Sequence, residues 1–130
     1  MDGDNLEVVR RAFGAIQRRD SDSLIAGFDA SVHIRSLLTE AEGPDFRGHD
    51  GAREWLHAVL DVFPDWSPHV ESVRSLDGGV VSALHVVATS VLGVPIDQVY
   101  WHATRVSDGR IVFFGFFRSE AEAVEALSAG

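Results

Sequence analysis

The N-terminal part of the chain has the hydrophobic pattern of a helix. Its apolar residues recur at spacings of three and four, at Leu6, Val9, Phe13 and Ile16, which is the helical period. Asp4 and Glu7 have the spacing of an acidic capping box at the start of this stripe. The polar run 20–23 interrupts the pattern and offers N-caps to a second, short helix. The sequence therefore predicts two consecutive helices.

The strongest helical pattern lies near the middle of the chain. We predict that this helix begins at His49 or Asp50 and ends at Pro64, because proline does not continue a helix. His49 is expected to order its first turn, and His57 falls on its polar face. The apolar face consists of Ala52, Trp55, Leu56, Val59, Leu60 and Phe63.

Runs with the character of strands occupy most of the remaining chain. One precedes the central helix and four follow it: Val32–Leu38, then His69–Leu76, Val80–Leu92, Gln98–Val106 and Ile111–Phe117. The segment Thr39–Gly48 is acidic and contains Gly43 and Pro44, so it is predicted to be a loop. Ser119 and Glu122 are spaced to cap a terminal helix.

The connections between the later strands are short. Asp77–Gly79 and Ser107–Arg110 are typical of hairpin turns, and Gly93–Asp97 is also short. Such connections join antiparallel neighbours, since parallel strands need long crossovers. The order of elements predicts an α+β fold, in which three N-terminal helices pack on one face of a curved, mostly antiparallel sheet. No linker or repeat interrupts residues 1–130, so we predict one domain with a short C-terminal helix.

The predicted strand Gln98–Val106 has two different faces. Gln98, Tyr100, His102 and Thr104 alternate with Val99, Trp101, Ala103 and Arg105. Either the polar face is in water and the apolar face on the core, or the polar face lines an enclosed cavity and Trp101 lies on a covered outer face. Alternation alone does not choose between the two arrangements.

The last predicted strand, Ile111–Phe117, is apolar on both faces, whereas a half-exposed antiparallel strand alternates. An exposed pair such as Phe113 and Phe117 would form an adhesive patch. We therefore expect a homodimer packed through the outer face of the sheet, with cover by the terminal helix as the alternative. The remaining histidines are interpreted as surface or interface positions: His33, His69 and His85.

Composition excludes several classes of function. The chain has 11 Lys plus Arg, all of them arginine, against 20 Asp plus Glu, and its net charge of −9 disfavours nucleic-acid binding. Without lysine or cysteine there is no P-loop lysine, Schiff base, thiol nucleophile or cysteine-ligated metal. The acidic start and the lack of a long apolar run predict a cytoplasmic protein without a membrane segment. No HExxH, GxSxG or GxGxxG motif is present, so we expect neither a metal nor another cofactor.

The sequence resembles the SnoaL-like, polyketide cyclase-like branch of the nuclear-transport-factor-2-like superfamily, which also contains the ketosteroid isomerases. The order and spacing of five segments carry the resemblance: Asn5–Phe13, Arg19–Asp20, Phe46–Gly51, Phe63–Asp65 and Ser107–Ile111. The resemblance implies a cone-shaped sheet wrapped around three helices, with an apolar pocket at the wide end. It also implies dimers through the outer face of the sheet.

The resemblance places three family positions in this sequence. The pocket carboxylic acid of the penultimate strand, three residues before the Arg105–Val106 pair, corresponds to His102. The general-base aspartate of the isomerases corresponds to Ser36, and their first-helix tyrosine to Ala12. The isomerase mechanism is therefore not expected, but a histidine with a pKa near neutrality can transfer protons at the cyclase-like position.

Two functions follow as expectations. The first is an acid–base enzyme of the isomerase or cyclase type, acting on a small apolar carbonyl or polycyclic compound, with His102 as the proton-transfer group and Tyr100 assisting. The second is a non-catalytic dimeric module that binds a hydrophobic ligand or a partner protein. Trp66 and the acidic loop around Glu40 are expected to cover the mouth of the pocket. The other expected pocket residues are Ser36, Trp55, Gln98, Thr104, Phe114 and Phe116.

Overall fold

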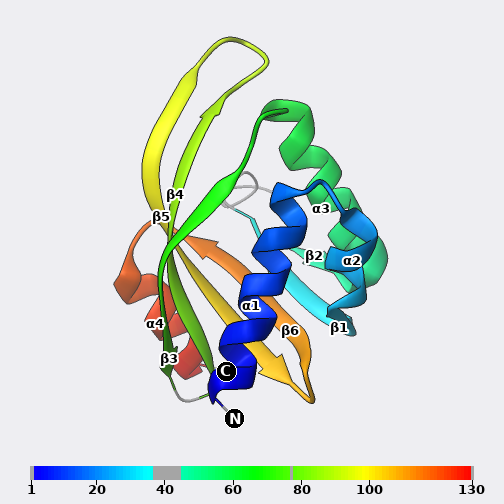
Figure 1. Ribbon diagram of the computed structural model, residues 1–130, viewed down its shortest axis with the longest axis vertical. Helices are drawn as coiled ribbons and strands as arrows, with labels where there is room; N and C mark the ends of the chain where they lie inside the picture. The colour runs from blue at the N-terminus through cyan, green and yellow to red at the C-terminus, as the bar shows by residue number, and fades with distance from the viewer. Residues whose placement is uncertain (1, 37–44, 77, 130) are drawn as a thin grey trace.

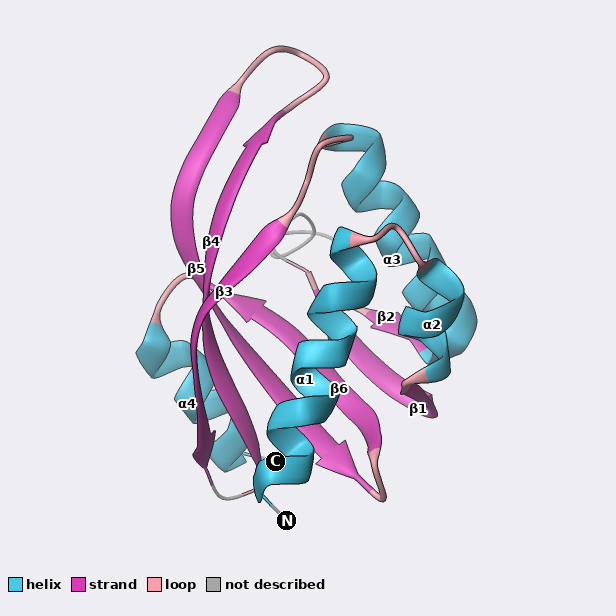
Figure 2. Ribbon diagram, in the orientation of Figure 1, coloured by secondary structure: helices cyan, strands magenta, loops and turns pink. Residues whose placement is uncertain are grey.

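A computed structural model describes residues 2–36, 45–76 and 78–129. It confirms the α+β fold, with three N-terminal helices, a mostly antiparallel sheet and a short C-terminal helix (Figure 2). The helices are α1 (Asp2–Gln17), α2 (Ser21–Ala26), α3 (Gly48–Val62) and α4 (Glu120–Ala129). The strands are β1 (Phe28–Arg35), β2 (Phe46–Arg47), β3 (Pro68–Leu76), β4 (Gly79–Thr89), β5 (Pro95–Ser107) and β6 (Arg110–Phe117).

The six strands form one sheet in the order β2-β1-β6-β5-β4-β3. All neighbouring strands are antiparallel except β1 and β6, which are parallel. The long β4–β5 hairpin extends beyond the other strands, at the top of Figure 1. Helices α1, α2 and α3 cover the inner face of the sheet, and α4 lies on the outer face (Figure 1).

Local chemistry sets the breaks between the first elements. Asp20 caps α2, because its carboxylate accepts hydrogen bonds from the backbone N–H and the hydroxyl of Ser23 at 3.2 and 2.7 Å. Arg19 has a φ of 59°, which turns the chain between α1 and α2. In the first turn of α3, His49 donates from Nε2 to the carbonyl of Phe28 at 2.8 Å, which ties this helix to β1 as well as ordering its start.

The first strand begins earlier than its hydrophobic pattern predicts, at Phe28 rather than Val32. The polar residues Asp29 and Ser31 interrupt the apolar pattern at the start of this strand. The Asp29 carboxylate accepts a hydrogen bond from the backbone N–H of Ser31 at 2.9 Å. Parallel pairing with β6 nevertheless starts at Phe28. The predicted end at Leu38 lies outside the described residues. The two-residue strand β2, within the predicted loop Thr39–Gly48, is too short to leave a periodic pattern.

The turn between β4 and β5 also differs from the prediction. We predicted a strand to Leu92 and a connection at Gly93–Asp97, but β4 ends at Thr89 and β5 begins at Pro95. The backbone N–H of Ser90 donates to the carbonyl of Val94 at 2.9 Å and closes the turn. Leu92 sits in it 88% exposed, so its apolar character reflects no burial.

Cover for the outer face of β6 comes from within the chain. Helix α4 contributes the buried residues Ala123 and Leu127 to a second apolar cluster. Its other buried members come from the sheet: Val81, Ala103 and Phe117. The terminal-helix alternative therefore accounts for the doubly apolar character of β6. The dimer stays a prediction that rests on other parts of the outer face.

Candidate functional site

A cavity lies between α3 and the inner face of the sheet, at the part of the β4–β5 hairpin that is nearer to its turn. Its empty space is about 540 Å³, including the solvent at its open end. The walls come from α3 and the segment after it, from strands β4, β5 and β6, and from the residue that follows β1. The lining residues are Ser36, Trp55, Val59, Phe63, Trp66, Val86, Ala88, Ile96, Tyr100 and Phe116.

Three aromatic rings form one wall of the cavity. The rings of Trp55 and Phe116 stack with their centroids 5.7 Å apart, and Trp66 meets the Trp55 ring edge-on at 5.9 Å. Trp55 projects from the apolar face of α3, while Trp66 follows the end of that helix and its backbone N–H donates to the carbonyl of Phe63 at 3.0 Å. Edge-on and offset contacts are favoured between aromatic rings, so this wall is preformed.

Beneath this wall lies a row of side chains that crosses three strands. Ser82 on β4 pairs with His102 on β5, and His102 pairs with Phe116 on β6. Directly paired residues of antiparallel strands point to the same face, and here that is the inner face. Phe116 is the member of the row that also lines the cavity.

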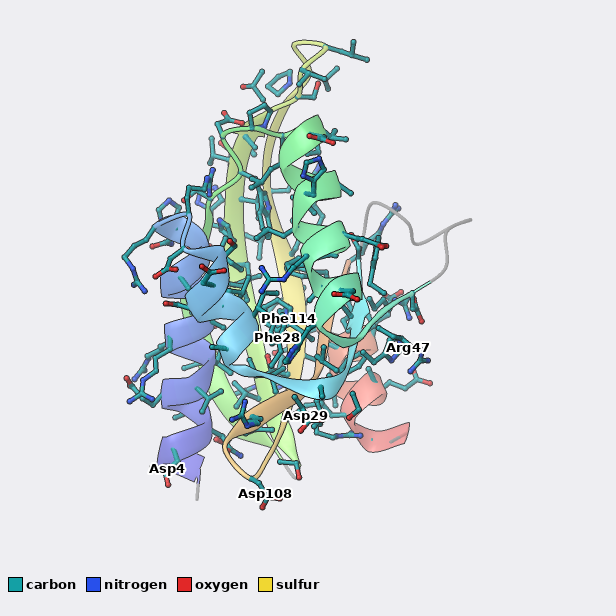
Figure 3. The ribbon with its side chains drawn as sticks, turned by 90° about the vertical axis from the view of Figure 1, so that its right-hand side faces the viewer. Asp4, Phe28, Asp29, Arg47, Asp108 and Phe114 are labelled. Atoms are coloured by element: carbon teal, nitrogen blue, oxygen red, sulfur yellow. The ribbon has the colours of Figure 1, made fainter. Side chains whose placement is uncertain are left out.

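His102 is completely buried in an aromatic shell. Its ring centroid lies 4.2 Å from that of Phe114, 4.6 Å from Phe116 and 5.0 Å from Phe13 of α1. Phe114 in turn packs against Phe28 at 5.2 Å, in the interior between helices and sheet (Figure 3). Among these rings Phe116 alone also lines the cavity, and His102 does not belong to the cavity lining.

The electrostatics of His102 follow from this burial. Loss of solvent lowers the pKa of its imidazole from 6.5 to about 3, because the apolar surroundings disfavour the charged form. The hydroxyl oxygen of Thr104 lies 3.0 Å from Nδ1 of His102. Nε2 has no hydrogen-bond partner within the described part of the chain. His102 is therefore a neutral imidazole at neutral pH, with one nitrogen hydrogen-bonded and the other not.

The structure brings some of the predicted pocket residues together and separates others. Five of them line the cavity: Ser36, Trp55, Trp66, Tyr100 and Phe116. Three others are fully buried behind its wall: His102, Thr104 and Phe114. Gln98 is exposed, contrary to its expected place in the pocket. Glu40, expected to cover the mouth, lies outside the described residues.

The position of Gln98 has a simple physical cause. Strand β5 is longer than β6, and their pairing stops at Trp101 and Phe117. Gln98 lies past this point, where none of the described strands pairs with β5 on that side. Alternation assigned it to the correct face but could not show where the adjacent strand ends.

Half of the wall consists of residues whose sequence pattern does not indicate a pocket role. These residues are the aliphatic and aromatic side chains Val59, Phe63, Val86, Ala88 and Ile96. Val59 and Phe63 belong to the apolar stripe of α3, which indicated burial without distinguishing a cavity wall from the core. Val86 and Ala88 are on a strand that is apolar on both faces for much of its length, so its pattern gave no signal.

The described residues hold no group of three or more His, Asp or Glu side chains placed to bind a metal ion. Pairs do occur at the surface: His33 lies 2.6 Å from Asp45, and His85 lies 2.6 Å from Asp97. The hydrogen bond that the His85 ring donates to the Asp97 carboxylate raises the pKa of His85. Across the described ranges, no helix is long and apolar enough to cross a membrane.

Comparison with known proteins places this arrangement in a broader context. A family model described as SnoaL-like domain matches residues 9–114. No curated protein matches the chain significantly in sequence.

Several solved structures share the fold. An NTF2-like protein of unknown function from Burkholderia pseudomallei K96243 superposes with a TM-score of 0.80 at 20% identity, over 96% of this chain and 98% of that one. TerC, co-crystallised with polyporic acid, has a TM-score of 0.79 at 18% identity, over 98% and 99% of the two chains. A protein from Catenulispora acidiphila DSM 44928 with a ketosteroid isomerase-like fold, in complex with trimethylamine, gives 0.75 at 12% identity, over 94% and 92%. At these identities the likeness is one of fold.

Proposed function

The chain belongs to the SnoaL-like domain family, and we propose that it binds a small, largely apolar molecule in the cavity between α3 and the sheet. The observation that carries this proposal is the composition of the wall. Among the described lining residues, and apart from the indole nitrogens, only Ser36 and Tyr100 bring polar side-chain groups to a wall that is otherwise aliphatic and aromatic. Pockets of this kind bind apolar ligands and use their few polar groups to orient them.

The preformed aromatic wall favours a flat ligand. Trp55, Trp66 and Phe116 already pack against one another and form an aromatic surface on which a planar ring system can stack. The Tyr100 hydroxyl can bond to a polar group at the edge of such a ligand. An aromatic or polycyclic compound with a carbonyl group fits both features.

Two structural neighbours support small-molecule binding by this fold. TerC was crystallised with polyporic acid, and the Catenulispora protein with trimethylamine. For this chain we infer from them only that the fold accommodates small molecules.

The burial of His102 favours binding over acid–base catalysis. A general base must come within hydrogen-bonding reach of the proton that it abstracts, whereas the Phe114 and Phe116 rings cover His102. An imidazole whose pKa is about 3 is also neutral and weakly basic at neutral pH. Isomerase-type or cyclase-type chemistry at His102 would therefore require a movement of its aromatic cover.

We also propose that two copies associate through the outer face of the sheet. Helix α4 covers only part of this face, and Val87 and Val99 remain 51% and 45% exposed beside the half-buried Trp101. A contiguous patch of exposed aliphatic side chains on one sheet face is typical of a protein–protein interface. A second copy of this chain would bury them symmetrically.

Tryptophan fluorescence tests the binding proposal. Trp55 and Trp66 line the cavity and Trp101 lies outside it, so the Trp101→Phe variant reports on the cavity alone. Polyporic acid and a panel of aromatic ketones are the probes. We expect saturable quenching by at least one probe, with the same affinity in wild type and Trp101→Phe. The proposal would be contradicted if no probe quenched the fluorescence of wild type, or if quenching were lost in the Trp101→Phe variant.

A further inference from the structure

Two buried ring nitrogens beside the cavity have no hydrogen-bond partner within the described part of the chain. They are Nε1 of Trp55 and Nε2 of His102. Both rings contact Phe116, with centroid distances of 5.7 and 4.6 Å. Two hydroxyl oxygens in the described part of the chain are in the same state: that of Ser82, the residue paired with His102 on the adjacent strand, and that of Ser75 on β3.

Partnerless buried polar atoms are rare because each has given up its hydrogen bonds to water without replacement. Folding gains nothing from placing two such rings, those of Trp55 and His102, against one aromatic side chain. A binding site explains the arrangement, since a ligand atom can supply the missing partner. The cavity reaches this place, because Trp55 and Phe116 both belong to its wall.

Phe116 is placed to act as a movable cover. Its ring lines the cavity on one side and packs on His102 on the other. It lies one residue before the end of β6, where the pairing with β5 also ends. Rotation of this single side chain would join the buried row to the cavity without breaking a hydrogen bond.

We propose that Phe116 covers a polar inner end of the cavity, and that the Trp55 N–H donates a hydrogen bond there to an uncharged oxygen atom of the ligand. The inference rests on the proposed function, and it adds a specificity-determining donor and the chemistry of the ligand group that meets it. His102 and Ser82 form the far side of this inner end.

The chemistry of these residues defines the ligand group. An indole N–H can only donate, so the ligand must offer an acceptor. The buried polar residues in the described part of the chain are Ser36, Ser82, His102 and Thr104. None of them carries a charge at neutral pH, since burial lowers the pKa of His102 to about 3. A carboxylate or ammonium group would lack a counter-charge there, whereas a ketone oxygen would be satisfied.

Three probes of similar shape separate these possibilities: 2-acetylnaphthalene, 2-isopropenylnaphthalene and 2-naphthoate. They carry a neutral acceptor, no acceptor and a charged acceptor on the same ring system. Titration calorimetry of the full chain is expected to show the ketone binding at least tenfold more tightly than the hydrocarbon, and the carboxylate more weakly than the ketone. In ¹⁵N-resolved NMR, the Trp55 indole proton is expected to shift downfield with the ketone and not with the hydrocarbon.

Matched variants assign the preference to one nitrogen. Trp55→Phe removes the proposed donor, and Trp66→Phe makes the same change on the same wall. We expect Trp55→Phe to abolish the tenfold preference for the ketone and Trp66→Phe to retain it.

Phe116→Ala removes the cover and is expected to accelerate ketone association at least tenfold. An unchanged rate would overturn the role of Phe116.

The outcomes distinguish the inference from the function on which it rests. Equal binding of ketone and hydrocarbon, or an unmoved Trp55 indole resonance, would overturn the inference while leaving an apolar binding cavity. A preference for the ketone that persists in Trp55→Phe would overturn the assignment to Trp55. Failure of all three probes to bind would count against the proposed function and the inference together.

Discussion

The hydroxyl oxygen of Thr104 lies 3.0 Å from Nδ1 of His102, two residues away on the same face of β5. Both side chains are fully buried, and the contact fixes the plane of the imidazole between the Phe13, Phe114 and Phe116 rings. A buried ring held in this way is part of the core and also the most strongly perturbed titratable group that the structure describes. The first prediction follows from this combination.

His102 is expected to make the protein sensitive to acid. The pKa of the folded state is about 3 and that of the unfolded chain 6.5. Below pH 6.5 the unfolded state therefore binds a proton that the folded state does not, and the free energy of unfolding falls as the pH falls towards 3. Between about pH 7 and about pH 5 the loss due to His102 is about 2 kcal/mol.

Urea denaturation at these two pH values measures the effect. His102→Leu is expected to lose less stability between them than wild type does, whatever its absolute stability. His57→Gln serves as the control, since its side chain is 80% exposed at the surface. An equal pH dependence in wild type and His102→Leu would show that the imidazole titrates normally.

Filling the cavity is expected to weaken ligand binding. Val86 is a buried residue of the cavity wall, and Val86→Phe would place a ring in the empty space of about 540 Å³. The affinity for the tightest probe is expected to fall at least tenfold while the melting temperature changes little. Val94→Phe adds the same ring in the exposed turn after β4 and should bind like wild type. Equal affinities in both variants would place the probe outside this cavity.

A charge on the open part of the outer sheet face is expected to prevent dimer formation. Light scattering at micromolar concentration should give wild type twice the chain mass of 14.2 kDa. Val99→Glu places a carboxylate opposite His85 on the proposed interface and should yield the monomer mass. Val94→Glu adds the same charge in the β4–β5 turn and should remain dimeric. A monomeric wild type would refute the assembly.

The packing of α4 on the sheet is expected to depend on the absence of a side chain at Gly79. A Cβ at this position would clash with the backbone oxygen of Thr104 and lie 2.9 Å from Cδ2 of Leu127. Gly79→Ala is therefore expected to reduce the free energy of unfolding by about 1–3 kcal/mol. At Gly27 the nearest atom to a new Cβ is 3.5 Å away, so Gly27→Ala should change stability by about 0.5 kcal/mol or less. Similar losses in the two variants would contradict this account.

Periodicity in the sequence predicted the elements well where the pattern was long. The stripe of α3 gave its length nearly to the residue, and turn residues separated the last strands. Its limit is clear at Leu92, an apolar residue in a solvent-exposed turn, and at Asp29, a polar residue inside a strand. At Leu92 the backbone hydrogen bond that closes the turn decides the conformation, and at Asp29 the pairing of β1 with the distant strand β6 does so.

The neighbours of β1 could not be predicted in the same way. Its parallel pairing with β6 joins segments from opposite ends of the chain, and no local turn records such a pairing. The same applies to α4. The sequence left open whether this helix or a second subunit covers β6, because the apolar pattern of a strand shows that a face is covered without showing by what.

The sequence by itself determined the α+β class, the order of the elements and the shared face of Tyr100, His102 and Thr104, since alternation along a strand is a local property. Only the tertiary structure decided the depth of each side chain on that face. Tyr100 reaches the cavity, and His102 is sealed beneath Phe116. Depth depends on rings supplied by α1 and β6, which come from distant parts of the chain and meet His102 only when the sheet curves around the helices.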